Sequence, residues 1–408
     1  MRRILGAVLT AHYLAAFTAL GMPVFMSRVL AQLAPHAPDW MVGTLYVLPT
    51  ICTALTATTW GKLADRYGRK LSLMRAQLGL ACGFVLAGFA PNLPVFVLAL
   101  IIQGGCGGSL AAANAYLATQ TQGASLSRAL DWTQFSARMA MLTAPVLLGF
   151  ATDRGLAQGL YAWLALLPLL GLAITSRLPA DAPTSKPRPS RDTAAVTSAR
   201  SVSGELLGLL GVQFLYYFAV VVTFPYFILY SNRLGITDNG LAGLAYSLPH
   251  LVYLLMLPFL RSASPAPLRP LLFGLSLLAA TSWLQAMPMH AALLWPLRVL
   301  YGVGITLAIT GLNRALSSCA ARVSAGRLFG LFDACGKWAG ALGGIAAGAL
   351  VHRYGLAMPF FAAALAGALA LVAATLVHSK LLRGLPRRQS DGDSQGEKRS
   401  SPLGSRVG

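Results

Sequence analysis

Acidic side chains are scarce in this chain of 408 residues, where 12 Asp and Glu stand against 32 Lys and Arg and leave a formal net charge of +20. Charged residues of either sign make up 11% of the chain, whereas a soluble domain carries about 25%. Apolar residues make up 56%, and the mean hydropathy is +0.63. This composition excludes a soluble enzyme. It also argues against a nucleic-acid-binding protein, because the cations lie between long apolar runs.

Cysteine clusters and nucleotide-binding motifs are also lacking. The five cysteines fall at irregular spacing, which predicts neither a metal cluster nor a disulfide framework. No GxxxxGK[ST] loop occurs, and the glycine-rich segment 104–108 lies inside an apolar run rather than after a strand. We therefore expect no metal, no cofactor and no enzymatic activity, which leaves transport driven by an ion gradient.

Long apolar runs dominate the rest of the chain. A helix that crosses the hydrocarbon core needs about 20 mostly apolar residues, and backbone in lipid must satisfy its own hydrogen bonds. The sequence thus predicts an all-α membrane protein with twelve transmembrane helices. They are expected near residues 5–29, 40–60, 71–90, 94–120, 128–151, 157–177, 204–231, 239–260, 270–287, 291–318, 326–350 and 357–380.

One polar segment divides these runs. Residues 178–203 are rich in Pro, Ser and Arg, as a flexible linker would be. We expect an N-terminal six-helix half (1–177), a cytoplasmic linker (178–203), a C-terminal six-helix half (204–380) and a disordered cytoplasmic tail (381–408). With the N-terminus in the cytoplasm, 25 of the 32 cations fall on the cytoplasmic side, so we expect both termini there.

The two halves share an internal repeat. An offset of 199 residues places Asn114 on Asn313, Arg138 on Lys337 and Gly149 on Gly348. A cation ten residues into the same span of both halves is an uncommon coincidence in an apolar sequence. The pattern predicts two pseudo-symmetric halves.

The loop after the second run carries the strongest local motif: Gly61-Lys62-Leu63-Ala64-Asp65-Arg66-Tyr67-Gly68-Arg69-Lys70. It resembles the loop motif G-x-L-A-D-R-x-G-R-[KR] of the major facilitator superfamily at every fixed position. The resemblance implies the major facilitator fold, with Gly61, Asp65, Arg66, Gly68 and Arg69 as a latch between the cytoplasmic ends of the halves. Gly61 is expected to admit a closely packed helix, and Asp65 to meet an arginine or a helix N-terminus. The alternative is a positive-inside loop without a gating role.

Two other family motifs are incomplete. The R-x-x-Q-G pattern of drug/proton antiporters survives as Gln103-Gly104, with Leu100 in place of the arginine. Arg298 in the tenth run is a candidate substitute, unless its side chain extends to the membrane interface. The glycine-proline motif of exporters keeps only Pro145 and Gly149, which favours export over import weakly.

The cations that remain inside spans indicate the substrate. Arg138 and Lys337 fall near the middle of the bilayer on symmetry-related helices, where such transporters bind substrate. They favour an acidic or oxygen-rich substrate and a cavity that also includes Asn114, Asn313 and Tyr217. The alternative is neutralisation by a nearby acid, since Asp131 stands seven residues before Arg138 and Asp333 four residues before Lys337.

Few groups are available for proton coupling. The candidates are Asp131, Asp333, Arg298, His12 and His250, although a histidine in a span can equally be a hydrogen-bonded packing residue. Together with the resemblance, these features predict a monomeric, proton-driven exporter of a small organic molecule, a siderophore or amphipathic drug, in a bacterial inner membrane. The alternatives are a proton-coupled importer of a metabolite or organic acid and a membrane sensor or assembly partner that transports nothing.

Overall fold

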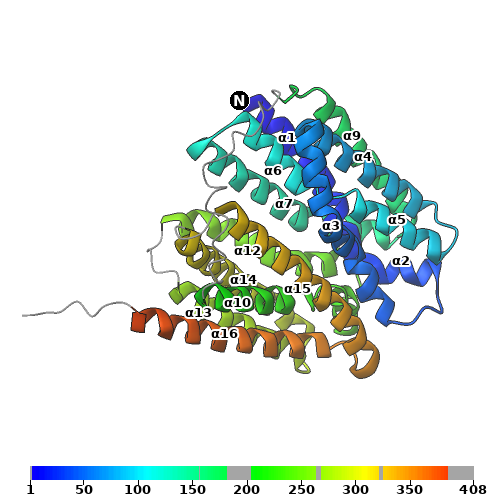
Figure 1. Ribbon diagram of the computed structural model, residues 1–408. Helices are drawn as coiled ribbons and strands as arrows, with labels where there is room; N and C mark the ends of the chain where they lie inside the picture. Colours follow the sequence, from blue (N-terminus) through cyan, green and yellow to red (C-terminus); the bar gives the residue numbers. More distant parts are fainter. Residues whose placement is uncertain (1, 156, 182–203, 263–267, 321–324, 385–408) are drawn as a thin grey trace, which may run out of the picture.

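The computed structural model describes residues 2–155, 157–181, 204–262, 268–320 and 325–384, and the described chain is almost entirely helical (Figure 1). Most of the predicted linker and tail, residues 182–203 and 385–408, lie outside the described residues. The elements are α1 (Arg2–Gly21), η1 (Met22–Phe25), α2 (Met26–Leu33), α3 (Trp40–Tyr67), α4 (Arg69–Gly88), α5 (Leu93–Gly105), α6 (Ser109–Gln120), α7 (Gly123–Thr152), α8 (Gly159–Leu164), α9 (Leu166–Ser176), α10 (Gly204–Val221), α11 (Phe227–Arg233), α12 (Asn239–Ser262), α13 (Leu268–Ala286), α14 (Ala291–Ala320), α15 (Ala325–Tyr354) and α16 (Met358–Gly384).

Every predicted span corresponds to a helix or to a pair of consecutive helices. Among the described residues, ten helical segments are long and apolar enough to cross a membrane, and Leu206–Val221 is a shorter apolar helix. Four spans are interrupted, which the apolar runs did not indicate. The fourth span, for example, unwinds between α5 and α6, where Gly108 has a φ of 91° that favours glycine.

The helix contacts of the first half recur in the second half. In the first half α1 packs against α7 and α9, α4 against α5 and α9, and α3 against α5. In the second half α10 packs against α15 and α16, α13 against α14 and α16, and α12 against α14. Each pair in one list is the repeat-related counterpart of a pair in the other, so the predicted pseudo-symmetric halves are confirmed.

Two helix pairs form most of the contact between the described parts of the halves, α3 with α15 and α7 with α12. Each crossing depends on a glycine that lies against backbone. A methyl group on Gly43 would overlap the carbonyl oxygen of Gly344, and one on Gly243 would overlap the carbonyl oxygen of Pro145. The repeat relates these two contacts to each other, so the seam between the halves is itself pseudo-symmetric.

A second pair of contacts extends the same seam. Gly348 lies against the carbonyl of Trp40, and Gly149 lies against the carbonyl of Asn239. Gly149 and Gly348 are the glycines that the offset of 199 residues aligned. All these contacts lie toward the end of the bundle where α3 begins and α15 ends.

The other end of the α3–α15 pair is open. Gly61, near the end of α3, and Gly330, near the start of α15, have no neighbouring atom within 4 Å of the position that a Cβ would occupy. The expectation that Gly61 packs closely on another helix is therefore wrong for this conformation. The reason is that the halves separate toward this end.

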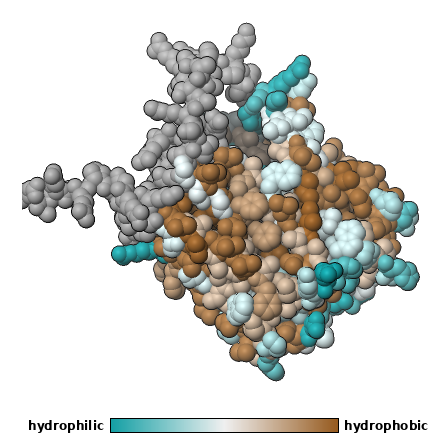
Figure 2. Space-filling model, turned by 60° about the horizontal axis from the view of Figure 1, so that its bottom comes forward, coloured by the Kyte–Doolittle hydropathy of each residue, from teal (hydrophilic) through white to brown (hydrophobic). Residues whose placement is uncertain are grey.

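Large apolar side chains cover much of the exterior. Phe89, Trp163, Phe259 and Leu365 are each more than 60% exposed. Figure 2 shows one face on which apolar residues predominate and hydrophilic ones gather toward the margins. Such a surface fits a chain whose solvent is lipid, and this is a multi-pass membrane protein.

The seam predicts a conformational effect for Gly43→Ala. Overpacking a helix crossing costs about 1–3 kcal/mol, which is enough to shift a two-state equilibrium by about tenfold. We expect Gly43→Ala to open the end where α3 begins. The measurement is the labelling rate of Thr50→Cys, in a protein whose five native cysteines are replaced by serine, with an impermeant maleimide added on that side of a proteoliposome.

Gly61→Ala is the matched control on the same helix, because no atom lies near Gly61 in this conformation. The labelling rate from that side should be the same in Gly61→Ala as in the parent, or lower. Equal labelling rates in the Gly43→Ala variant and the parent would contradict the role of this crossing.

Candidate functional site

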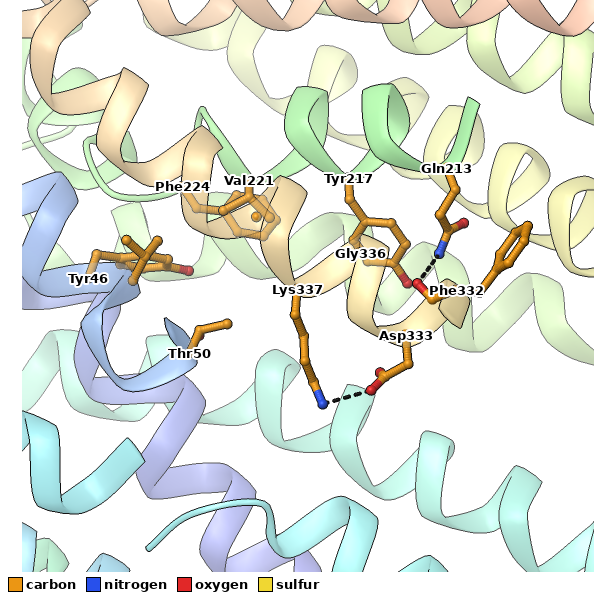
Figure 3. Close-up of a pocket in the computed structure, with 12 residues that line it drawn as sticks. Tyr46, Thr50, Gln213, Tyr217, Val221, Phe224, Phe332, Asp333, Gly336 and Lys337 are labelled. Atoms are coloured by element: carbon orange, nitrogen blue, oxygen red, sulfur yellow. Dashed lines mark hydrogen bonds and ion pairs between the residues drawn. The ribbon is translucent and has the colours of Figure 1, made fainter. Parts of the chain in front are cut away.

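A cavity of 240 Å³ lies between the halves (Figure 3). The first half contributes side chains from α3, and the second half contributes side chains from the α10 region and α15. The lining residues are Tyr46, Val47, Thr50, Gln213, Tyr217, Val221, Phe224, Phe332, Asp333, Gly336, Lys337 and Gly340. Because both halves form its wall, a movement of one half against the other changes its shape.

Lys337 is the cation of this cavity. Its Nζ lies 2.7 Å from Oδ2 of Asp333, one helical turn earlier on α15, and Figure 3 shows the pair facing Thr50. The ion pair that the spacing predicted is confirmed. The Asp333 side chain is 66% exposed, so water reaches the ion pair from that side. Lys337 can therefore exchange Asp333 for another anionic partner.

Arg138 lies on α7, outside the set of residues that line this cavity. Its Nη1 is 3.2 Å from Nδ1 of His250 on α12, and its guanidinium carbon is 4.5 Å from the ring centre of Tyr253. It also lies within electrostatic range of Tyr217, which lines the cavity. Within the described part of the chain, the contacts of Arg138 are thus to a neutral acceptor and a ring rather than to a carboxylate.

Arginine only donates hydrogen bonds, so Nδ1 of His250 accepts and carries no proton in this arrangement. His250 is only 2% exposed, so bulk water does not replace Arg138 as its hydrogen-bond partner. The Arg138–His250 contact crosses from one half to the other, and a proton on Nδ1 would break it.

Arg298 is 1% exposed, so the alternative in which its side chain extends to the membrane interface is wrong. Its Nε and Nη2 each donate to a backbone carbonyl of α12, at 3.0 Å to Ala245 and 3.0 Å to Tyr246. The rings of Phe227 and Tyr301 also lie against it, with centres 4.4 and 4.8 Å from the guanidinium carbon. Its position is interior, between helices of the second half.

Other predicted residues lie elsewhere. His12 is buried between α1 and α7, where its Nδ1 is 3.1 Å from the Ser136 hydroxyl, as a packing histidine would be. Asn114 accepts a hydrogen bond of 2.7 Å from Thr133, and neither Asn114 nor Asn313 lines the cavity. Asp131 and Asn313 are exposed.

The loop that carries the family motif forms the turn between α3 and α4. Gly68 has a φ of 107°, which explains the glycine, and its amide donates to the carbonyl of Ala64 at 3.0 Å. Asp65 pairs with the guanidinium of Arg69, so the arginine alternative holds for this acid. Arg66 lies over the ring of Tyr67 at 5.3 Å.

The start of α4 is bound by an acid that the sequence analysis did not identify. Oδ2 of Asp181 accepts from the backbone amides of Arg69 and of Lys70, the latter at 3.0 Å. Lys70 in turn donates to the carbonyls of Ser176 and Leu178 at 2.7 and 2.6 Å. The first residues of the predicted linker are thereby attached to the motif loop. The sequence feature that could have identified Asp181 is its position as an acid among cations, just after the sixth span.

These observations can be compared with known proteins. The family model of the Major Facilitator Superfamily matches residues 4–283. This chain belongs to the major facilitator superfamily. The twelve-span arrangement and the motif loop are those that the resemblance implied, so this is a secondary transporter and not an enzyme.

Curated relatives of this transporter include multidrug resistance proteins. The chain is 36% identical over 111 residues to the Multidrug resistance protein MdtG of Proteus mirabilis (strain HI4320), which is 27% of this chain and 28% of that protein. It is 34% identical over 142 residues to the MdtG protein of Dickeya zeae (strain Ech586), which is 34% of each. The matches therefore span about a third or less of the relatives.

Solved structures share the fold of this transporter. A peptide transporter POT variant has a TM-score of 0.75 at 14% identity and covers 93% of this chain and 94% of its own. The xylose transporter XylE from E. coli, in an inward open conformation, has a TM-score of 0.69 at 15% identity and covers 91% and 95%. These similarities extend the shared fold to the second half.

One pair of tyrosines on the seam of this transporter was also missed. The hydroxyls of Tyr46 on α3 and Tyr246 on α12 lie 3.4 Å apart. They occupy equivalent positions in the text Tyr-x-Leu-Pro, at 46–49 and 246–249, an offset of 200 residues that would have revealed them. Repeat-related residues that touch each other lie on the pseudo-two-fold axis, so this contact marks that axis.

Asp181 and Asp65 should have separable effects. A carboxylate that caps a helix N-terminus contributes about 1 kcal/mol, whereas an exposed i,i+4 ion pair contributes about 0.3–0.5 kcal/mol. We expect Asp181→Ala to lower the thermal unfolding midpoint of the purified transporter by about one degree more than Asp65→Ala does. Equal midpoints for the two variants would contradict the capping role of Asp181.

Proposed function

We propose that this transporter is a proton-driven exporter of a small amphipathic molecule that carries an acidic or chelating oxygen group, such as a drug or a siderophore. It acts as a monomer in a bacterial inner membrane by alternating access. The observation that carries the proposal is the cavity walled by both halves, with Lys337 and Tyr217 on its surface and Arg138 beside it.

The proposed position of the termini determines which end of the bundle faces the cytoplasm. With both termini in the cytoplasm, α3 begins at the outer face, so the glycine seam closes the outer end and the cavity faces the cytoplasm. Residues 1–177 and 204–380 act as the two bodies that rock, joined by the linker 178–203 and followed by the tail 381–408. This conformation is the one in which an exporter collects its substrate.

The cytoplasmic end has the elements for the opposite closure. Gly61 lies 18 residues after Gly43 on α3, and Gly330 lies 18 residues before Gly348 on α15, which is five helical turns in each case. The same face of each helix thus offers a glycine at both ends. We propose that Gly61 meets α15 when the outer end opens, and that Asp65, Arg66 and Arg69 then latch the two halves.

Substrate class follows from the wall of the cavity. Tyr46, Tyr217 and Phe224 offer aromatic surface to a bulky ligand, and the exposed Lys337–Asp333 pair offers a cation that an anionic group can share. Arg138 adds a second cation, since a histidine and a ring are weaker partners than a carboxylate. The names of the curated relatives, multidrug resistance proteins, support export of such molecules.

We assign the coupling of transport to proton uptake to the Arg138–His250 contact. A proton on Nδ1 of His250 and the hydrogen bond from Arg138 exclude each other, so proton uptake releases Arg138 and the contact between α7 and α12. The charged and titratable groups around His250 are Arg138 from α7, Arg298 from α14 and Tyr246 on its own helix. Asp131 and Asp333 remain alternatives for this role.

Two dyes test the substrate class. Sulforhodamine B is a bulky aromatic anion, and rhodamine 6G carries the same ring system with a positive charge. We expect everted vesicles with an acid interior to accumulate sulforhodamine B in preference to rhodamine 6G. Lys337→Met and Arg138→Met should each reduce the rate for sulforhodamine B by about tenfold, because each removes a charge-assisted contact of about 1.5–3 kcal/mol.

The direction of the dye flux also separates the main alternatives. Accumulation that requires the opposite gradient would favour the proton-coupled importer. Preference for the cationic dye, unchanged in both variants, would contradict the anionic substrate class.

His250→Asn tests the coupling site. The asparagine carbonyl can still accept from Arg138 but cannot take up a proton. We expect this variant to lose accumulation driven by the pH gradient and to retain exchange of dye between equal pools. His12→Asn is the matched control, since His12 is buried away from the seam, and it should keep gradient-driven accumulation. Gradient-driven accumulation by His250→Asn would exclude His250 as the coupling residue.

A further inference from the structure

Arg298 is a buried cation whose described contacts include no carboxylate. Its guanidinium is 1% exposed, donates to two consecutive carbonyls of α12 and is covered by two aromatic rings. A charge in the interior of a membrane protein is costly, so its retention calls for a partner that needs it. The partner in this structure is the backbone of a neighbouring helix.

The sequence of α12 explains why that backbone needs a donor. In a helix the carbonyl of residue 245 accepts from the amide of residue 249, but residue 249 is proline and has no amide hydrogen. The carbonyl of Ala245 is therefore released from the helical ladder inside the protein. Nε of Arg298 replaces the missing donor at 3.0 Å, and Nη2 adds a second bond, to Tyr246.

The first half provides an internal comparison. Gly104 of α5 packs on Pro49 of α3, and Gly302 of α14 packs on Pro249 of α12. In both halves a glycine of one helix thus lies against the proline of a neighbouring helix. One turn before these glycines the first half has Leu100, whereas the second half has Arg298. Only the bend of α12 is held by an arginine at this position.

The segment that Arg298 holds carries two contacts to the other half. Tyr246, whose carbonyl Arg298 binds, reaches Tyr46, and His250, the residue after the proline, reaches Arg138. Both residues lie within the turn that surrounds Pro249. A change in the bend would move both of them with respect to α3 and α7.

We infer that Arg298 is a positioning residue. It fixes the bend of α12 at Pro249 by replacing the missing amide donor, and thereby holds Tyr246 and His250 in register with Tyr46 and Arg138. It acts through the backbone of α12 and touches neither substrate nor proton. The consequence for transport rests on the proposed function, whereas the backbone bond itself does not.

The experiment is a double-mutant cycle between Arg298→Met and Pro249→Ala, made in the full-length protein. The alanine restores the amide at position 249, which can donate to Ala245 along the helix, so the arginine is no longer required for that carbonyl. We expect Arg298→Met to lower the rate of sulforhodamine B transport by about tenfold in the parent and by less than about threefold in the Pro249→Ala background.

Pro49→Ala is the matched control. It removes the repeat-related proline of α3, whose released carbonyl belongs to Leu45 and has no contact with Arg298 among those the structure gives. It should leave the tenfold loss unchanged. Arg298→Lys keeps the charge but lacks the planar fork that spans two carbonyls, so it should show a loss that Pro249→Ala also relieves.

The thermal unfolding midpoint of each purified variant is a second readout that needs no substrate. Rescue of both midpoint and transport by Pro249→Ala alone would support the inference. Additive losses, rescue by Pro49→Ala as well, or normal behaviour of Arg298→Met would overturn it. If the parent transports neither dye, the proposed function fails, and the cycle in unfolding midpoints still decides the role of Arg298.

Discussion

A cation inside a membrane protein requires a polar partner, and this constraint organises the centre of the molecule. The three cations within spans meet it in three ways. Lys337 pairs with a carboxylate one turn away, and Arg298 binds two backbone carbonyls, one of which a proline has released. Arg138 has a histidine and an aromatic ring from the other half of the protein. The partners of Arg138 are uncharged, and the carboxylate that pairs with Lys337 is 66% exposed, so these two cations are the ones for which a ligand can compete.

Symmetry supplies the framework, and departures from it supply the function. The seam repeats itself across the pseudo-two-fold axis, with Gly43 on Gly344 matched by Gly243 on Pro145 and with Tyr46 touching Tyr246 on the axis. The charged positions do not repeat in this way. Arg298 stands opposite Leu100, and the repeat partners Arg138 and Lys337 have different neighbours. The bend that is held by a cation and the histidine that contacts a cation both lie on α12.

Much of this architecture could be predicted from the sequence, because the membrane imposes strong patterns. Twelve apolar runs gave twelve spans, the motif loop gave the family, and the four-residue spacing gave the Asp333–Lys337 pair. Contacts between distant segments could not be predicted, since no local pattern records which helix faces Arg138 or Arg298. Asp181 was missed because its partners are backbone amides 111 and 112 residues away. Gly61 was misjudged because no local pattern records that the halves separate at this end of the bundle.

The central claim is that the halves close alternately at their two ends around a fixed axis. The most direct test is a pair of distance measurements between spin labels by pulsed electron resonance. One pair, at Lys62 and Leu331, reports the end where α3 finishes, and the other, at His36 and His352, reports the end where α3 begins. The account predicts that acidification or a bound anionic dye lengthens one distance while it shortens the other. Two distances that stay constant, or that lengthen and shorten together, would contradict it.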